Sequence, residues 1–166
     1  MSKSSFYHYL GSKEALFDTV VTEVGAALVD SLDVPDPSEL VGDGFWSRIA
    51  QILDRLMVLG QREVWFTDLG RLFYLADAPS GEGSALGRAL AGVDEWLEQT
   101  LAAGRASRAV RDDLPTSLQR HLTFAVLRAM DDWSLQHMED LDTQQRRRLA
   151  EAQLDTIRRL LAPARA

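Results

Sequence analysis

Apolar residues recur every three or four positions along almost the whole chain, between clusters of turn-forming residues. One such stripe consists of Leu86, Leu90, Val93, Leu97 and Leu101. Side chains at this spacing share one face of an α-helix, so the pattern predicts amphipathic helices. No run alternates apolar and polar residues with the β-branched enrichment typical of a strand. The sequence therefore predicts an all-α fold.

Groups of helix-breaking residues divide this pattern. Residues 33–38 contain two prolines, each of which lacks a backbone donor and restricts the residue before it. Residues 77–83 are rich in turn formers, and residues 109–115 form a short connection that ends in proline. The first break is the best internal boundary, and it predicts a division into residues 1–32 and 33–166.

The breaks and the capping residues beside them place the helix ends. Serine, threonine and aspartate favour the first position of a helix, because their side chains accept hydrogen bonds from free backbone N–H groups. We expect helices from Ser12 to about Leu32, from Asp43 or Gly44 to an interruption at 60–62, from Ser84 to near Gly104, from Thr116 or Ser117 onward, and from Asp142 or Thr143 to Pro163.

The first residues of the chain form a short, polar, aromatic and basic segment. Ser2 is placed to cap a first helix, Gly11 to end it, and Ser12 to cap a second one. Glu14 falls in the first turn of that second helix, where the helix dipole favours an acid. Positive or titratable side chains and tyrosines gather here, as expected of a helix that meets DNA: Lys3, Tyr7, His8, Tyr9 and Lys13.

The segment from residue 2 to residue 17 reads Ser-Lys-Ser-Ser-Phe-Tyr-His-Tyr-Leu-Gly-Ser-Lys-Glu-Ala-Leu-Phe. It resembles the end of the helix-turn-helix in the TetR family of bacterial transcriptional repressors. In that family, this segment is the recognition helix and the start of the connecting helix. Residues 104–115 also resemble the family's junction before its first dimerisation helix. The resemblance implies a TetR-like helical bundle, with DNA contacts at Lys3, Ser4, Tyr7, His8 and Lys13.

The chain departs from the family pattern at its beginning. A complete member has two helices before the recognition helix, whereas this chain begins inside the motif. Either the start lies too far downstream, or half of the DNA-binding module is lost. We favour a misplaced start, because the family commonly has valine before the Ser-Lys pair and a valine codon can initiate translation. Residues 1–32 are then a remnant DNA-binding domain, and operator DNA is a partner if the full N-terminal domain is present.

Large side chains of the central helices are the candidates for a ligand pocket. Pockets are mostly apolar with few polar groups, and the resembling family often encloses a cavity between such helices. The resemblance therefore implies a small apolar or amphipathic effector. The alternative for any single aromatic residue is plain core, and Arg128 has the alternative of pairing with Asp131 on one helix face. The candidate set is Trp65, Phe66, Phe73, Tyr74, Trp96, Phe124, Arg128, Met130 and Trp133.

The last two helices are the expected dimer contact. The apolar stripe of 117–141 is broad enough to meet more than one neighbour, and residues 144–162 carry an apolar face. In the family, two such helices from each copy form a four-helix bundle. The sequence thus predicts a homodimeric, effector-released repressor whose ligand-binding and dimerisation domain spans 33–166. The alternative is a ligand-binding or dimerisation module that has lost DNA binding.

Composition and motifs bear on other classes of function, such as nucleic-acid binding, metal binding and catalysis. The chain of 166 residues has no cysteine and a net charge of −7, which argues against broad nucleic-acid binding but allows a small local basic face. Its three histidines are widely spaced, and we expect His121 and His137 to be ordinary surface or core residues rather than ligands. No catalytic motif, cofactor motif, signal peptide or membrane span is apparent. We therefore expect a cytoplasmic protein that is not an enzyme and has no cofactor.

Overall fold

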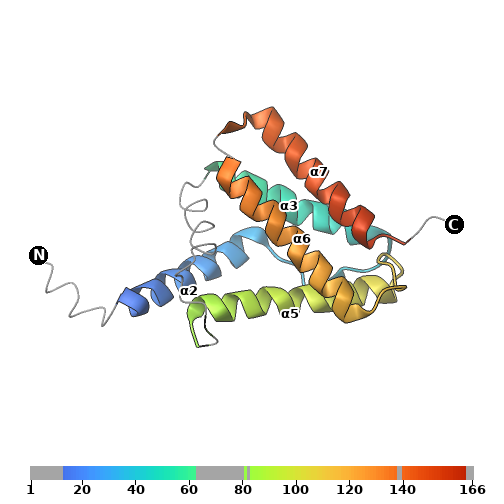
Figure 1. Ribbon diagram of the computed structural model, residues 1–166, viewed down its shortest axis with the longest axis horizontal. Helices are drawn as coiled ribbons and strands as arrows, with labels where there is room; N and C mark the ends of the chain where they lie inside the picture. Colours follow the sequence, from blue (N-terminus) through green and yellow to red (C-terminus); the bar gives the residue numbers. More distant parts are fainter. Residues whose placement is uncertain (1–12, 63–80, 82, 138–139, 164–166) are drawn as a thin grey trace, which may run out of the picture.

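The computed structural model describes residues 13–62, 81, 83–137 and 140–163. Within these ranges the chain forms five α-helices, two short 3-10 turns and no β-strand (Figure 1), which confirms the all-α prediction. None of these helices is long and apolar enough to cross a membrane. The elements are α2 (Lys13–Leu32), η1 (Pro37–Glu39), η2 (Gly42–Gly44), α3 (Phe45–Arg62), α5 (Ala85–Ala106), α6 (Thr116–His137) and α7 (Thr143–Leu161).

Capping residues define where several of these helices begin. The Ser84 side chain accepts a hydrogen bond from the backbone N–H of Gly87 and begins α5. Asp142 and Gln145 form a reciprocal capping box at the start of α7, each side chain accepting from the other residue's backbone N–H. The helix expected to reach an interruption at 60–62 is α3, which includes Gly60 and ends at Arg62. A single glycine costs only about 1 kcal/mol in a helix, which tertiary packing overrides.

The main core is built where α3, α5 and α7 meet the connections between them. α3 packs against α7, α6 packs against both α5 and α7, and η1 packs against α5. The seven buried side chains of this main core are Leu40, Phe45, Leu97, Leu101, Val110, Ile157 and Leu161. Partly buried residues, including Trp46, Ile49 and Leu160, surround them.

The helix α2 lies to one side of this core, and its N-terminal end points away from the other helices (Figure 1). Its main partner is the first half of α5. A second and smaller group of buried residues joins them, and we call it the α2 cluster: Val21, Ala85 and Leu86, with Phe17 and Leu90 packed against them. The break predicted at 33–38 is present between α2 and η1, although the division into two domains stays a prediction.

Candidate functional site

Lys13 is the one candidate DNA contact that falls within the described residues. It is the first residue of α2 and is exposed, at the end of the helix that points away from the core. Glu14 follows it in the first turn. The other candidates, Lys3, Ser4 and the Tyr7–His8 pair, lie outside the described residues. Their role in DNA contact stays a prediction.

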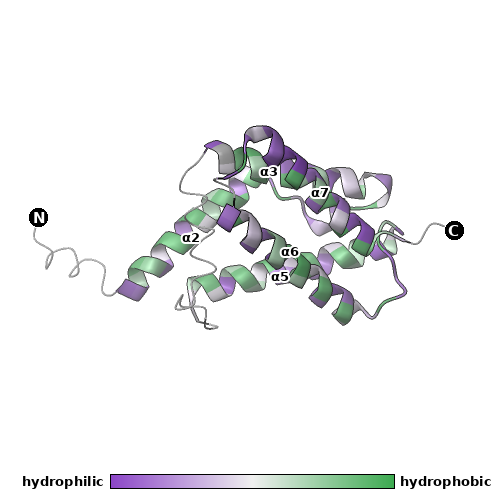
Figure 2. Ribbon diagram, turned by 45° about the horizontal axis from the view of Figure 1, so that its top comes forward, coloured by the Kyte–Doolittle hydropathy of each residue, from purple (hydrophilic) through white to green (hydrophobic). Residues whose placement is uncertain are grey.

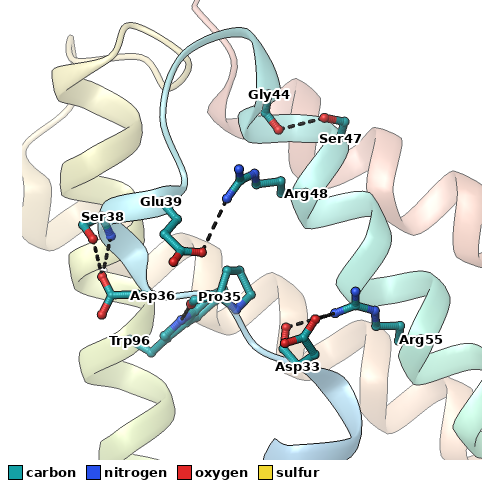
Figure 3. A network of polar contacts seen from close by, with 10 residues as sticks. All are labelled: Asp33, Pro35, Asp36, Ser38, Glu39, Gly44, Ser47, Arg48, Arg55 and Trp96. Atoms are coloured by element: carbon teal, nitrogen blue, oxygen red, sulfur yellow. Dashed lines mark hydrogen bonds and ion pairs between the residues drawn. The ribbon is translucent and has the colours of Figure 1, made fainter.

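The C-terminal end of α2 is held by an arginine from α3. The Arg55 Nη1 atom donates to the backbone oxygens of Leu32, at 2.8 Å, and of Asp33, at 3.0 Å. The same atom lies 3.0 Å from the Asp33 carboxylate (Figure 3). Free carbonyl groups at a helix end favour a cation, and Asp33 has the left-handed φ of 45° that commonly ends a helix. Arg55 thereby fixes where α2 stops and the linker begins.

The linker from Pro35 to Glu39 is pinned by polar contacts of its own (Figure 3). The indole N–H of Trp96 donates to the backbone oxygen of Pro35 at 3.1 Å. The Asp36 carboxylate accepts from the hydroxyl and the backbone N–H of Ser38, and these hydrogen bonds lower the pKa of Asp36 below its ordinary value of 3.8. Arg48 of α3 pairs with Glu39 at 3.5 Å. The linker therefore holds a defined conformation between α2 and the main core.

The candidate ligand residues divide into groups. Trp65, Phe66 and the Phe73–Tyr74 pair lie outside the described residues. Trp96, Phe124 and Met130 are partly buried and pack against the main core. Their role in ligand binding stays a prediction.

Arg128 and Trp133 are both exposed residues of α6. Trp133 is 45% exposed and stacks on His137 with ring centroids 4.4 Å apart. The His137 Nδ1 atom is 2.8 Å from the backbone oxygen of Trp133, so the ring is held within its own helix. Arg128 borders an open surface hollow of about 420 Å³, whose other described lining residues are Ala125, Ala129 and Asp132.

The two faces of α6 differ from those of an ordinary surface helix. Its fully buried residues are polar, namely Gln119, Thr123 and Ser134. By contrast, Leu118 and Leu127 are exposed, like Trp133. Apolar periodicity identified the helix, and Phe124 and Met130 do pack against the main core, but it did not reveal that the most deeply buried positions of α6 are polar.

The buried polar residues of α6 are satisfied by specific partners. The Gln119 amide oxygen accepts from Arg105 at 2.9 Å, and its amide nitrogen donates to the backbone oxygen of Arg111 at 3.0 Å. Arg105 also donates to the backbone oxygens of Asp112 and Leu114. A buried polar group without a partner costs about 1–3 kcal/mol, so these hydrogen bonds fix the loop between α5 and α6. No simple spacing in the sequence reveals this network, since its members belong to different elements.

One buried hydroxyl lacks such a partner. Thr100 in α5 is 3% exposed, and its oxygen has no hydrogen-bond partner among the described residues. It lies one helical turn after Trp96 and next to Leu101 of the main core. Unsatisfied buried polar groups are rare in folded proteins. Thr100 is therefore a polar group in the central helices that sequence reasoning did not select.

Metal-binding side chains do not gather in the part of the chain that the structure describes, where no group of three or more histidine, cysteine, aspartate or glutamate residues is placed to hold an ion. Comparison with models of known protein families, with curated protein sequences and with solved structures finds no match to this chain.

Proposed function

We propose that the chain is a TetR-like transcriptional regulator, a DNA-binding repressor that a small apolar or amphipathic effector releases from its operator. In this mechanism two copies associate through α6 and α7, and the effector binds among the helices of residues 33–166. Effector binding shifts α2 and changes the spacing of the two recognition helices. Such coupling requires the effector to bind one arrangement of α2 more tightly than the other.

The position of α2 is the observation that carries this proposal. The helix begins at Lys13, directly after the segment that resembles a recognition helix, and its N-terminal end lies away from the core (Figure 1). It meets the remaining helices through the small α2 cluster and through Arg55. A long helix attached in this way is suited to transmit movement between a DNA-contacting segment and a ligand-binding body.

The exposed side of α6 supports association of two copies. An exposed apolar surface on a helix favours burial against a partner. Small residues at Ala125 and Ala129 allow close approach of a second helix, and the larger side chains of Leu118 and Trp133 lie on the exposed side of α6 as well. A two-fold axis would place the same surface of each copy in contact. α7, which is largely hydrophilic in Figure 2, contributes charged residues beside α6.

Thr100 supports effector binding among the central helices. A buried hydroxyl without a hydrogen-bond partner is costly, and a polar group on an effector would satisfy it. Trp96 is one turn away on the same helix and partly buried. An amphipathic effector would match an apolar site that contains such an isolated polar group.

An electrophoretic mobility shift at low salt tests DNA binding directly. The probe is the region upstream of the gene that encodes this chain, and the competitor is unrelated DNA of the same length. We expect a protein that carries the full N-terminal domain to give a shifted band whose intensity falls steeply with added salt, because phosphate contacts release bound counterions. Absence of a shift at every protein concentration would favour the alternative function below.

Sedimentation of two matched variants tests the dimer. Ala129→Arg places a charge on the exposed side of α6, whereas Ala91→Arg places the same charge on an exposed position of α5. We expect the unmodified chain and Ala91→Arg to sediment as dimers at micromolar concentration and Ala129→Arg to sediment as a monomer. A monomeric unmodified chain would contradict the dimer.

A ligand-binding or dimerisation module without DNA binding is the second candidate. The excess of negative charge on α2 favours this second candidate. The helix has one lysine, Lys13, and four acidic residues: Glu14, Asp18, Glu23 and Asp30. Phosphate contacts need clustered basic residues, and within the described chain the arginines gather instead on α7. Such a module would sequester an effector, or would bind a full-length relative in an inactive heterodimer.

A further inference from the structure

Within the described residues, specific contacts join α2 to the body of the protein near Phe17 and at its C-terminal end. Near its middle, Phe17 and Val21 pack against the first turns of α5, within the α2 cluster. At its end, Leu32 and Asp33 meet Arg55 of α3. The seven buried residues of the main core include none from α2. Each attachment of α2 is therefore local.

The first attachment contains a hydrogen bond between two helices. The Asp18 Oδ1 atom accepts from the backbone N–H of Ala85, the first residue of α5, at 3.0 Å. The first N–H groups of a helix have no partner within the helix, and the helix dipole favours a negative charge there. Ser84 meets another of these groups, at Gly87. The start of α5 is thus capped by one residue of its own segment and by one carboxylate of α2.

The second attachment lies far from the first one along α2. Arg55 makes its contacts with Leu32 and Asp33 at the point where α2 continues into the linker. Asp18 precedes Leu32 by 14 residues, a distance of about 21 Å at 1.5 Å per residue. A small rotation of α2 about Asp33 therefore separates Asp18 from Ala85 while leaving Arg55 in place.

We propose that the Asp18–Ala85 contact is a releasable latch that sets the position of α2. α5 connects this latch to the ligand-binding region, because its first turn holds Asp18 and its second half carries Trp96, Thr100 and Leu101. A displacement of α5 by a bound effector would lengthen the Asp18–Ala85 hydrogen bond and free the N-terminal half of α2. The use of the latch in signalling rests on the proposed function, whereas the latch itself is a property of this chain.

Hydrogen exchange followed by mass spectrometry tests the latch without DNA or effector. The variants are Asp18→Ala, Asp18→Asn, which keeps an acceptor oxygen, and Glu23→Ala, which removes an exposed carboxylate from the same helix. We expect Asp18→Ala to speed exchange in residues 13–28 by about tenfold, as loss of a charge-assisted hydrogen bond implies. Asp18→Asn should fall between Asp18→Ala and the unmodified chain, and Glu23→Ala should match the unmodified chain.

The regions that stay protected complete the test. Exchange in residues 97–104 and 153–161, which contain main-core residues, should be the same in all variants. Equal exchange of residues 13–28 in Asp18→Ala and Glu23→Ala would overturn the proposal, and so would a loss of protection throughout Asp18→Ala. A normal latch in a protein that carries the full N-terminal domain but fails to shift DNA would disprove the proposed function alone, so the two failures are distinguishable.

Discussion

The main core and the α2 cluster use the same kinds of side chain but differ in how many elements they join. The main core draws on α3, α5, α7 and the connections before α3 and after α5, and it is reinforced by hydrogen bonds across elements. For example, the indole N–H of Trp46 donates to the backbone oxygen of Ala109. The backbone N–H of Arg111 donates to the backbone oxygen of Leu161. Among the residues that the structure describes, the α2 cluster joins two helices. Stability should therefore be concentrated in the main core, and local opening should be easiest at α2.

Two buried leucines of α5 provide the largest test of this comparison. Leu101 belongs to the main core and Leu86 to the α2 cluster, and each is 1% exposed. We expect Leu101→Ala to lower the free energy of unfolding by about 2–5 kcal/mol, because it leaves a cavity that many elements surround. Leu86→Ala should cost only about 1 kcal/mol, since detachment of α2 limits the loss. Urea unfolding monitored by circular dichroism measures both, and equal losses would contradict the difference between the clusters.

Replacing a helical glycine by alanine adds one methyl group, and two such positions compare the main core with α2. A Cβ atom on Gly104 would lie 2.5 Å from a methyl carbon of Val110 and 2.9 Å from the Phe45 ring, whereas Gly25 of α2 has no such atom within 4 Å. We expect Gly104→Ala to lower the free energy of unfolding by about 1–3 kcal/mol through overpacking. Gly25→Ala should raise it by about 0.5–1 kcal/mol, because alanine loses less backbone entropy in a helix. Thermal unfolding of both variants checks the opposite signs.

A residue with a left-handed backbone conformation follows each of the helices α5 and α2, and the two residues allow the two helix ends to be compared. Arg108 has a φ of 61° and Asp33 a φ of 45°, a conformation that glycine adopts at lower cost. We expect Arg108→Gly to raise the free energy of unfolding by about 0.5 kcal/mol. Asp33→Gly should give no such gain, because it also removes the carboxylate paired with Arg55. An equal gain in both variants would mean that the Asp33–Arg55 pair contributes nothing to stability.

Acid provides the smallest test, at the linker between the two regions. The pKa of Asp36 is lowered from 3.8 by hydrogen bonds from Ser38, so its stabilising effect is complete above the unfolded pKa and is lost as pH falls through the lower folded pKa. We expect Asp36→Asn to be slightly less stable than the unmodified chain at pH 6. The difference should shrink as the pH falls below 3.8 and through the lowered pKa of the folded state, because the aspartate then becomes protonated. A series of urea unfolding curves from pH 6 into acid measures this change, and a difference that does not shrink would assign it to another cause.

Local chemistry accounts for what the sequence predicted well. The helices begin and end where capping residues and prolines change the hydrogen bonding of a few neighbouring backbone groups, as at Ser84 and Asp142. Gly60 shows the limit of such signals, because the cost of one glycine is smaller than the packing energy of the helix that contains it.

Tertiary packing decided which side of each helix is buried and which polar groups meet. In α6 the buried positions are Gln119, Thr123 and Ser134, and Gln119 is satisfied by Arg105 of another helix. The contact between Asp18 and Ala85 likewise joins residues that are far apart in the chain. The spacing of apolar residues shows that a helix has an apolar face, but which element packs against that face depends on contacts between distant segments. Those contacts exist only after the helices have packed, so no local pattern of residues specifies them.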